Sequence, residues 1–432
     1  MRPMTSEEHF DAIIIGAGAS GLGAAYTLAK YGFNVLVIER GERVGSKNVF
    51  GGRIYSHVFE KVIDGFNREA PIERWVRKER LTLMDDNDAL TLELSVGNDE
   101  YRNSFTAYLS KFLRWLSKKA EENGAFILTG TKVDKVLIEN NKVSGVLAGG
   151  DVFKADVVID AEGVNPILAR DLGFRDDWKP HEVAIGVKEV IKLPKEVIED
   201  RLNLGDDEGV AQLFIGYPTK YLPGGGFLYT NKDSVTIGVV VRLEHAIRNR
   251  LPVYDIVEIF KRHPYVHSLL KGGSVIEYSA HLVPEVPMGN LDQLYGDGFL
   301  IVGDAAGFVL NTGIIIRGVD LAFWSGVLAA ETVKKAHDEG KYTKEALSYY
   351  ESLLRNSFII KELQAYNKAN AVLNNNTIYN NYVKSILGFV KDIYTVDDNV
   401  KKMLGTMLNS LHRNNLTLVT AMKDLITVLL NL

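Results

Sequence analysis

The sequence predicts an α/β protein in which a parallel-sheet domain is interrupted by a smaller, mainly antiparallel α+β domain and followed by a helical C-terminal region. Three observations predict this arrangement. A strand, glycine turn, helix and second strand occupy residues 11–40, short alternating strands occupy residues 180–280, and residues 345–432 are helical, polar and rich in Asn and Tyr. A further strand–loop–helix unit begins near residue 296, so the first domain resumes after the alternating segment.

The chain is organised around residues 11–40. The β-branched run at 13–15 has no polar alternation, which is typical of a buried parallel strand. Gly16, Gly18 and Gly21 follow at G-x-G-x-x-G spacing, and a helical pattern leads to a second apolar run that ends at Glu39. The glycines permit a tight turn, close approach of a pyrophosphate and close packing of the helix on the sheet, while the acid accepts hydrogen bonds from a ribose. The pattern predicts a Rossmann-like dinucleotide-binding unit. A glycine-rich turn that binds nothing does not explain why all these features coincide.

Composition excludes several classes of function. The net charge is −5, which gives no electrostatic reason to expect a nucleic-acid partner. The 432 residues include no cysteine, so disulfides, a cysteine nucleophile and a Cys-held iron–sulfur cluster are excluded within this chain. The first residues lack a charged-then-apolar leader and no apolar run reaches the ~18 residues that span a bilayer, so we expect a cytoplasmic protein.

The remaining patterns of the first half place several candidate residues. Residues 41–60 are loop-like, and the glycine, basic and amide side chains among them suit a loop over a bound cofactor; a solvated connector is the alternative. Strands are predicted within 80–96 with a turn at 85–88, and a helix is predicted over 105–123. Further strands are expected at 125–128, 133–138 and 143–147, and a buried strand then leads into a sharp turn near residue 161.

Two features of the second half leave alternatives open. Asp304 ends a buried strand, where a carboxylate either caps the next turn or binds a ligand hydroxyl. The final helix carries one apolar stripe, which indicates core packing, an oligomer contact or a membrane-surface anchor. The stripe consists of Val419, Met422, Leu425, Ile426, Leu429 and Leu430. A helix over 253–270 is expected to pause at Pro264, and His281 is expected to be structural.

Several blocks of sequence resemble known flavoproteins. GAGASG at 16–21, Glu39, the block from Val157 to Gly163 and Gly303-Asp304 are similar to the FAD-binding pattern of the large hydroxylase-like flavoprotein superfamily. The usual Ala-Asp-Gly stands here as Ala161-Glu162-Gly163. Longer blocks resemble the FixC family, relatives of electron-transfer flavoprotein:quinone oxidoreductase, over most of residues 10–335. These blocks are VIERGERVGSKNVFGGRIY, PTKYLPGGGFLYTNKDS, EYSAHLVPE and LIVGDAAGFVLNTGIIIRGVDLA.

The resemblance implies a set of binding residues. The ADP part of FAD would be held by Gly16, Ala17, Gly18, Ala19, Ser20, Gly21, Glu39 and Arg40, with Val133 near the adenine. The flavin and ribityl parts would be met by Lys47, Asn48, Gly52, Arg53, Glu162, Gly163, Gly303, Asp304, Asn311, Thr312 and Gly313. The helix after Gly313 would direct its N-terminus toward the flavin pyrimidine. Gly224 and Gly225 match a pair that contacts the quinone head group, although the preceding residue, commonly Tyr, is Pro223 here.

The resemblance also implies a function. Such a protein would take electrons from the α/β subunits of an electron-transfer flavoprotein onto FAD and pass them to a quinone, with peripheral contact to the inner face of the cell membrane. Because this chain has no cysteine, the iron–sulfur cluster of mitochondrial-type relatives would reside on a separate ferredoxin-like subunit. A geranylgeranyl-reductase-like enzyme is the alternative, although those relatives usually carry a cysteine where this chain has KNVFGGR. Two further hypotheses are a flavin hydroxylase that uses NAD(P)H and oxygen, and an FAD-bound assembly subunit without enzymatic activity.

These considerations give expected domain boundaries. We expect an FAD-binding domain formed by residues 1–78, 102–178 and 282–340, an inserted substrate or quinone domain formed by 79–101 and 179–281, and a helical region over 341–432.

Overall fold

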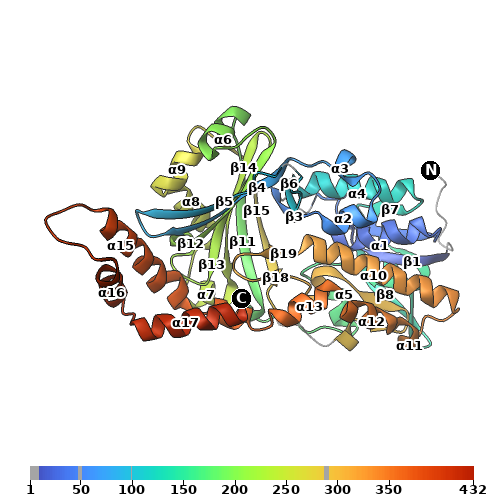
Figure 1. Ribbon diagram of the computed structural model, residues 1–432. Coiled ribbons are helices and arrows are strands. Elements are labelled where there is room, and N and C mark those ends of the chain that lie inside the picture. Colours follow the sequence, from blue (N-terminus) through green and yellow to red (C-terminus); the bar gives the residue numbers. More distant parts are fainter. Residues whose placement is uncertain (1–8, 47–50, 99, 287–290) are drawn as a thin grey trace.

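The computed structural model describes residues 9–46, 51–98, 100–286 and 291–432, and it contains two large sheets that lie side by side (Figure 1). The first sheet follows the predicted parallel pattern around β1, whose Ile13 and Ile14 are fully buried. Its strand order is β16 (Tyr295–Gly296), β17 (Phe299–Ile301), β10 (Asp151–Asp160), β1 (His9–Ile15), β2 (Val35–Glu39) and β7 (Phe126–Thr129). The antiparallel strands β8 (Val133–Glu139) and β9 (Lys142–Ala148) extend β10.

Several helices pack beside this first sheet. Helix α1 (Ala19–Lys30) packs against both α4 (Leu109–Glu122) and α10 (Val319–Asp338). Shorter helices complete this half of the molecule: α2 (His57–Val62), α3 (Phe66–Glu69), α5 (Ile167–Asp171), α11 (Lys344–Leu347), α12 (Tyr349–Asn356), α13 (Phe358–Ala365) and α14 (Ala369–Leu373).

The second sheet has nine strands and is assembled from two distant parts of the sequence. Its order is β15 (Ser274–Pro284), β11 (Val183–Lys192), β14 (Ser234–Arg242), β13 (Gly224–Thr230), β12 (Glu208–Gly216), β4 (Arg74–Met84), β6 (Ser104–Tyr108) and β3 (Gly51–Tyr55), with β5 (Ala89–Ser95) paired to β4. All neighbours are antiparallel except β4 and β12, which run parallel. Helices α6 (Lys195–Leu202), α8 (Val253–Arg262) and α9 (Pro264–Leu270) cover one face through an apolar cluster that includes Ile198, Phe260 and Val266; α7 (Leu243–Arg248) follows β14.

The C-terminal region ends in an arm that projects from the nine-stranded sheet (Figure 1). We call α15 (Val383–Tyr394), α16 (Met403–Arg413), α17 (Leu418–Asn431) and their connections the C-terminal arm. Helix α17 has no buried residue. Its stripe includes Val419, 77% exposed, and Leu430, 78% exposed, so it does not pack as core within this chain.

The α/β class and the helical C-terminal region are confirmed, and several local predictions are too. The turn at 85–88 joins β4 to β5, with the Asp85 amide donating to the Asp88 carbonyl at 3.1 Å. Asn140 and Asn141 both have positive φ, as the tight hairpin between β8 and β9 requires. Pro264 separates α8 from α9.

Two predicted boundaries are wrong. The helix predicted from residue 105 begins at Leu109, because Ser104–Tyr108 is entirely buried and pairs as β6 between β3 and β4. The predicted loop at 41–60 contains β3 and the start of α2. A long helix does follow Gly313, as expected; it begins at Val319, after a hairpin of β18 (Leu310–Asn311) and β19 (Ile316–Arg317).

Candidate functional site

The three fingerprint glycines have different physical roles. Gly16 has φ +102°, and a Cβ there would lie 2.5 Å from the Ala161 carbonyl oxygen of the neighbouring strand. A Cβ at Gly21 would collide with the Gly16 carbonyl. Gly18 is different, since among the residues that the structure describes a Cβ there meets nothing within 4 Å. Gly16 and Gly21 are therefore required by packing, whereas Gly18 keeps open the space through which a phosphate can approach the backbone.

The first turn of α1 faces this open space. Gly18 is the N-cap and offers no side-chain cap, and the first turn of α1 contains no acidic residue. The free N–H groups of Ala19 and Ser20 and the helix dipole therefore remain available to an anionic ligand. Glu39 closes the adjacent side, where its carboxylate accepts hydrogen bonds from the amides of Ala17 (3.0 Å) and Gly41 (2.6 Å).

The neighbouring residues predicted for the ADP part lie on the same sheet. Arg40 follows Glu39 and is exposed, and Val133 is buried at the start of β8. The carboxyl ends of β1, β2 and β10 meet here because these strands are parallel neighbours.

The end of β10 holds two carboxylates with different surroundings. Glu162 accepts a hydrogen bond from the Leu168 amide at 2.7 Å, so its carboxylate caps α5, and Gly163 has φ +78°. Asp160 is fully buried, and its Oδ1 accepts from the Glu162 amide at 2.9 Å. Burial, with the charge of Glu162 adding to it, raises the pKa of Asp160 to about 8. Sequence reasoning missed Asp160, although an acid that ends an apolar strand beside a glycine turn is a usable signal.

The loop at 303–306 reaches the start of α1. Gly303 has φ +67°, and a Cβ there would lie 2.5 Å from the Ser20 hydroxyl oxygen. This contact brings Asp304 close to the N-terminus of α1, although the two are far apart in the sequence. Burial raises the pKa of Asp304 to about 6. The open space at Gly18, the free N–H groups and Asp304 together fit the phosphates and the ribityl hydroxyls of FAD.

The residues predicted along the flavin are only partly described. Lys47 and Asn48 lie outside the described residues, and Gly52 is buried in β3. Arg53 donates to Glu79 on β4 (Nη1 to Oε2, 2.9 Å) and to Ser104 on β6 (2.9 Å). Its guanidinium lies 4.5 Å from the centre of the Tyr55 ring. The charge of Arg53 is therefore balanced within the second sheet.

Tyr55 connects this strand to the start of α10, a link that the sequence did not indicate. The Arg317 guanidinium lies 5.2 Å from the Tyr55 ring and donates to Asp320 (Nε, 2.9 Å) and Glu362 (2.6 Å). Tyr55 thus has an arginine near it from each of the two halves of the molecule.

The predicted residues at 311–313 form a tight turn before α10. The Gly313 amide donates to the Asn311 side chain at 2.8 Å, and the Thr312 amide donates to the Ile315 carbonyl at 3.0 Å. Asn311 also donates to Glu285 at 2.7 Å, which ties the turn to the end of β15. A small cleft, open to solvent, lies here between Glu285, Leu310, Asn311, Tyr366 and Asn370.

One face of the second sheet is free of the helices α6, α8 and α9, and we call it the open face. The strand registers place Gly225, Val240, Gly186 and His281 in one row across it, and Phe227, Gly238, Lys188 and Ser279 in the next row. The same face continues across β12, β4 and β5 through Leu213, Leu81, Leu83, Leu92 and Leu94. Leu92 and Leu94 are 73% and 61% exposed, so the open face ends in an uncovered apolar strip.

The predicted glycine pair lies at the edge of this face. A Cβ at Gly224 would collide with the Val240 carbonyl, and one at Gly225 would lie 2.8 Å from the Phe214 carbonyl oxygen. Close strand packing therefore requires both glycines regardless of any ligand, which leaves their predicted role in quinone binding untested.

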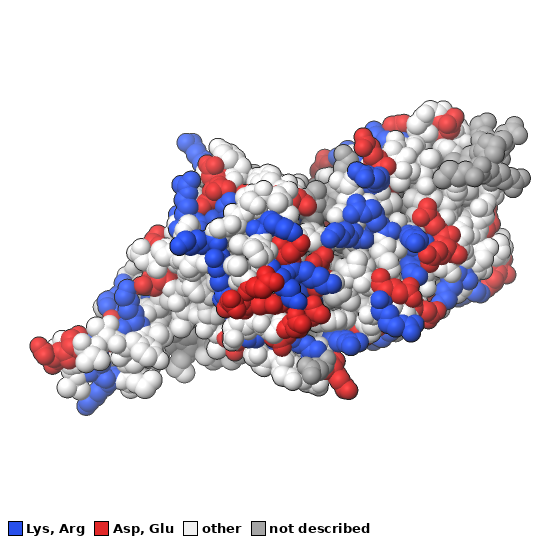
Figure 2. All heavy atoms as spheres, turned by 90° about the horizontal axis from the view of Figure 1, so that it is seen from above, with Lys and Arg blue, Asp and Glu red and all other residues white. Residues whose placement is uncertain are grey.

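Other classes of site receive no support. Within the described residues, no group of three or more His, Asp or Glu side chains is arranged to hold a metal ion. In that same part of the chain, no helix has both the length and the apolar character needed to cross a bilayer. Basic and acidic side chains are interspersed over the face seen in Figure 2.

Two known families match segments of this chain, one around the dinucleotide-binding unit and one in the second sheet. Residues 11–88 match the family described as FAD dependent oxidoreductase, and residues 183–283 match the one described as ETF-QO, ubiquinone-binding. The second match spans the strands from β11 to β15, which include Gly225 and Lys188 of the open face.

Comparison with individual proteins covers almost the whole chain. Protein FixC of Escherichia coli (strain K12) is 44% identical over 401 residues, which is 92% of this chain and 94% of the relative. "Probable electron transfer flavoprotein-quinone oxidoreductase YdiS" of the same organism is 40% identical over 97% of this chain and 98% of its own length. Among solved structures, a geranylgeranyl bacteriochlorophyll reductase-like protein from Thermoplasma acidophilum shares the fold with a TM-score of 0.73 at 20% identity, covering 98% of this chain and 99% of that one.

The resemblance to the FixC family and the expectation of FAD are thereby confirmed. At this identity and coverage the relationship extends through the C-terminal region, where the sequence blocks alone had faded. The chain belongs to the FixC family and is a quinone-linked, FAD-dependent oxidoreductase.

Proposed function

We propose that this chain accepts electrons from an electron-transfer flavoprotein and passes them to a quinone bound at the open face of the second sheet. The observation that carries the proposal is the junction between two features. One is a dinucleotide cradle at the ends of β1, β2 and β10, and the other is a sheet face whose strands from β11 to β15 lie within the segment matched to a ubiquinone-binding family. Tyr55 and Arg317 link the two halves at that junction.

The binding residues follow from the cradle. FAD, when bound, supplies the two-electron chemistry of the protein. The backbone amides from Gly18 to Ser20 would hold its pyrophosphate, Glu39 the adenosine ribose and Asp304 the ribityl chain. Glu39 already accepts two backbone hydrogen bonds, which fixes its carboxylate beside the loop before a ligand arrives.

The partners follow from the relatives and from composition. The relatives' names include an electron transfer flavoprotein-quinone oxidoreductase, which supports an electron-transfer flavoprotein as the donor. The chain has no cysteine and therefore cannot ligate an iron–sulfur cluster through thiolates. We therefore also propose a separate ferredoxin-like iron–sulfur subunit.

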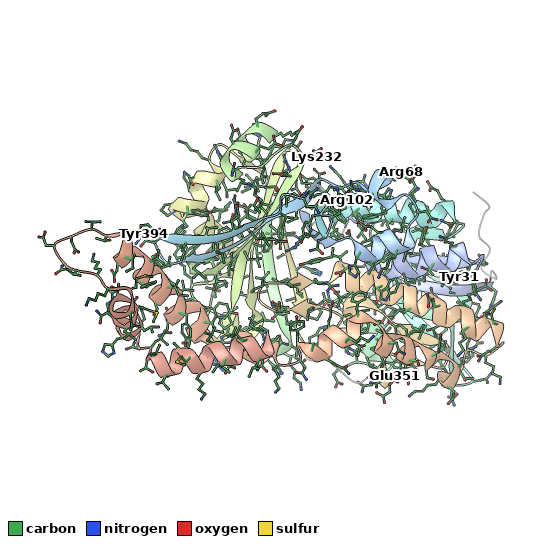
Figure 3. All side chains as sticks on the ribbon, in the orientation of Figure 1. Tyr31, Arg68, Arg102, Lys232, Glu351 and Tyr394 are labelled. Atoms are coloured by element: carbon green, nitrogen blue, oxygen red, sulfur yellow. The ribbon has the colours of Figure 1, made fainter. Side chains whose placement is uncertain are left out.

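The C-terminal arm is the proposed membrane contact. Figure 3 places Tyr394, which is 83% exposed, on this arm. The following connection exposes Val396 (96%) and Val400 (90%), and the stripe of α17 adds a second apolar surface. Apolar side chains on a projecting element suit the interfacial region of a bilayer, which also dissolves the quinone. Co-sedimentation with phosphatidylglycerol-containing vesicles tests this. Val396→Asp with Val400→Asp should weaken binding, and Ile138→Asp, at an exposed apolar position on β8, should leave it unchanged.

The cofactor site is tested by a matched pair of glycine variants. Gly18→Val places a branched side chain where a Cβ meets none of the described residues within 4 Å, and it should give a folded, colourless protein after FAD supplementation. Gly97→Val, where a Cβ also meets nothing within 4 Å, should retain FAD. FAD retention by Gly18→Val would contradict the proposed pyrophosphate position.

The electron path is tested by mixing the FAD-loaded protein anaerobically with a reduced electron-transfer flavoprotein and then with a soluble menaquinone analogue. Flavin reduction in the first step and reoxidation in the second are expected. Reduction by NADPH, with oxygen consumption driven by an aromatic substrate, would instead indicate a hydroxylase.

A second candidate function is supported by the apolar open face. The Thermoplasma acidophilum neighbour is titled geranylgeranyl bacteriochlorophyll reductase-like, and an apolar strip from Leu213 to Leu94 would also accept an isoprenoid chain. Saturation of a prenyl-lipid double bond by the reduced protein would favour this reading over quinone reduction.

A further inference from the structure

A buried ion pair lies at the end of the second sheet, beside the turn at residues 311–313. Arg242 is the last residue of β14, and Glu285 follows the last residue of β15. Arg242 Nη2 lies 3.2 Å from Glu285 Oε2, and the two side chains are only 5% and 6% exposed. A charge held this far from water is costly unless it is compensated, so each group needs the other. The electron path described above gives this pair no role.

The second oxygen of the Glu285 carboxylate holds the turn. Glu285 Oε1 accepts a hydrogen bond from Asn311 Nδ2 at 2.7 Å, and Asn311 Oδ1 accepts one from the Gly313 amide at 2.8 Å. These partners fix the orientation of the Asn311 amide, because an ionised carboxylate only accepts and a backbone N–H only donates. The Arg242 guanidinium, the carboxylate, the side-chain amide and the Gly313 N–H therefore form one chain in which every donor meets an acceptor.

Helix α14 holds the same chain from another side. Asn370 accepts from Arg242 Nη2 at 2.8 Å and donates to the Glu285 carbonyl at 2.9 Å. Gly313 also lies against this helix, since a Cβ there would lie 2.9 Å from Leu373 Cδ2, and its φ of +81° favours glycine. The turn is thus held between the end of the second sheet and α14.

We propose that the Arg242–Glu285 pair is the positioning element that sets the 311–313 turn against the isoalloxazine ring of FAD. This inference rests on the position expected for FAD, with its ring beside residues 311–313, and adds the residues that hold the turn there. The pair acts through Asn311, so neither of its members is a catalytic residue. The chain of bonds runs from the second sheet to the turn before α10, so it also ties the proposed quinone-binding sheet to the cofactor.

A change of one atom in this pair should reach the turn. Glu285→Gln leaves one acceptor oxygen where the chain needs two. The Arg242 guanidinium, as the charged donor, takes that oxygen, and the new NH2 group then faces Asn311 Nδ2. Relief requires the Asn311 amide to turn over, which presents its own NH2 group to the Gly313 N–H. The hydrogen bond that closes the turn is then lost, although every side chain keeps its size.

The test compares Glu285→Gln with Glu189→Gln, its matched control. Glu189 is 5% exposed on β11 of the same sheet and pairs with Lys261 at 2.5 Å, and it takes part in none of the contacts described above. Both variants lose one buried carboxylate, so both should unfold at a lower urea concentration. Only Glu285→Gln should bind FAD about tenfold more weakly, and only in this variant should the visible circular dichroism of the bound flavin change.

A double variant makes the test specific for this chain of bonds. Asn311→Asp alone sets two carboxylates against each other and should weaken FAD binding. Glu285→Gln combined with Asn311→Asp exchanges the amide and the carboxylate. The oxygen of the new amide then accepts from Arg242, its NH2 group donates to the new carboxylate, and that carboxylate accepts from the Gly313 amide. The double variant should bind FAD more tightly than Asn311→Asp alone, which two independent losses cannot produce.

Hydrogen exchange of the apoprotein reports on the turn without the cofactor. Exchange at the Gly313 amide, followed by mass spectrometry, should be about tenfold faster in Glu285→Gln and unchanged in Glu189→Gln. If Glu285→Gln fails to fold, Asn370→Ala replaces it, because this change keeps both charges and removes two of the bonds that hold them. Weaker FAD binding and faster exchange at Gly313 are expected in that variant too.

The outcomes are distinct. Equal FAD affinity of Glu285→Gln and Glu189→Gln, or a double variant weaker than both single variants, would overturn the positioning role. Faster exchange at Gly313 with unchanged FAD affinity would overturn the contact between the turn and the flavin. A wild-type protein whose reduced flavin no quinone oxidises would overturn the proposed function alone, because the role of the ion pair is read from FAD binding.

Discussion

The contact between α1 and α10 leads to a sharp prediction about a glycine outside the fingerprint. A Cβ at Gly23, in the interior of α1, would lie 2.5 Å from the Phe323 carbonyl oxygen and 3.1 Å from Phe323 Cδ2. On the facing helix, a Cβ at Gly326 would collide with the Ser20 carbonyl. The two helices therefore touch backbone to backbone at the turn that carries the anion-binding amides.

Gly23→Ala requires a measurable retreat of α10. The Phe323 carbonyl must move by about 0.9 Å to reach 3.4 Å, the lower limit of ordinary contact. Because the contacting atom belongs to a helix backbone, the whole turn has to move with it. Overpacking of this kind costs about 1–3 kcal/mol, and the displacement places it in the upper part of that range. Alanine recovers about 1 kcal/mol through helix propensity, which leaves a net loss of about 2 kcal/mol.

Urea unfolding of the apoprotein measures this loss, and FAD titration measures whether the displaced turn binds more weakly. Gly405→Ala is the matched control, because Gly405 is also inside a helix, α16, and a Cβ there meets nothing within 4 Å. That variant should be stabilised by up to about 1 kcal/mol. A Gly23→Ala protein as stable as Gly405→Ala would refute the reasoning, since both variants would then show only the gain in helix propensity and no cost of overpacking.

Three other predictions concern buried polar groups. Arg74 is 1% exposed and donates to Glu199 (2.9 Å) and to the carbonyls of Asn231 (2.8 Å) and Glu208 (2.9 Å). Arg74→Met leaves these acceptors buried without a partner, so the free energy of unfolding measured in urea should fall by about 3–5 kcal/mol. A loss below ~1 kcal/mol would contradict this. Burial raises the pKa of Asp160 to about 8, above an unfolded value of about 3.9, so the apoprotein should lose stability as pH rises from about 4 to 8. Asp160→Asn should flatten this pH dependence of the unfolding free energy. Asp151→Asn, at the exposed start of the same strand, is the control and should leave it unchanged. Asp304→Ala should weaken FAD binding about tenfold by titration while the protein stays folded, and an unchanged affinity would exclude Asp304 from the ribityl site.

The dinucleotide unit could be predicted from sequence because its determinants are local. Gly16, Gly18 and Gly21 lie within six residues, and Glu39 follows after one helix and one strand, so spacing alone carries the geometry. The fold class followed for the same reason. The start of α4 was misplaced because an aromatic and β-branched run can belong to either a buried strand or a helix, and only its pairing with β3 and β4 decides the outcome.

The contacts that build the rest of the site depend on long-range register. Nothing near Gly23 in the sequence indicates its contact with Phe323, and nothing near Lys188 indicates that Ser279 lies beside it on the next strand. Tyr55 and Arg317 meet only because β3 joins the second sheet at its far end. Periodicity fixes which face a side chain occupies, but the identity of its neighbours requires the strand order.

The parallel pairing of β4 with β12 has a consequence for how the chain reaches its native state. Trp75 aligns with Glu208 and Met84 with Gly216, so the ladder closes a loop of more than a hundred residues that includes part of the other sheet. Strand pairings between residues this far apart in the sequence form late, and proteins that depend on them fold slowly. A fragment cut at the boundaries of the ubiquinone-binding match would leave the edge of β12 bare and prone to association. The second sheet is therefore complete only when β4, from the N-terminal part of the chain, has joined it.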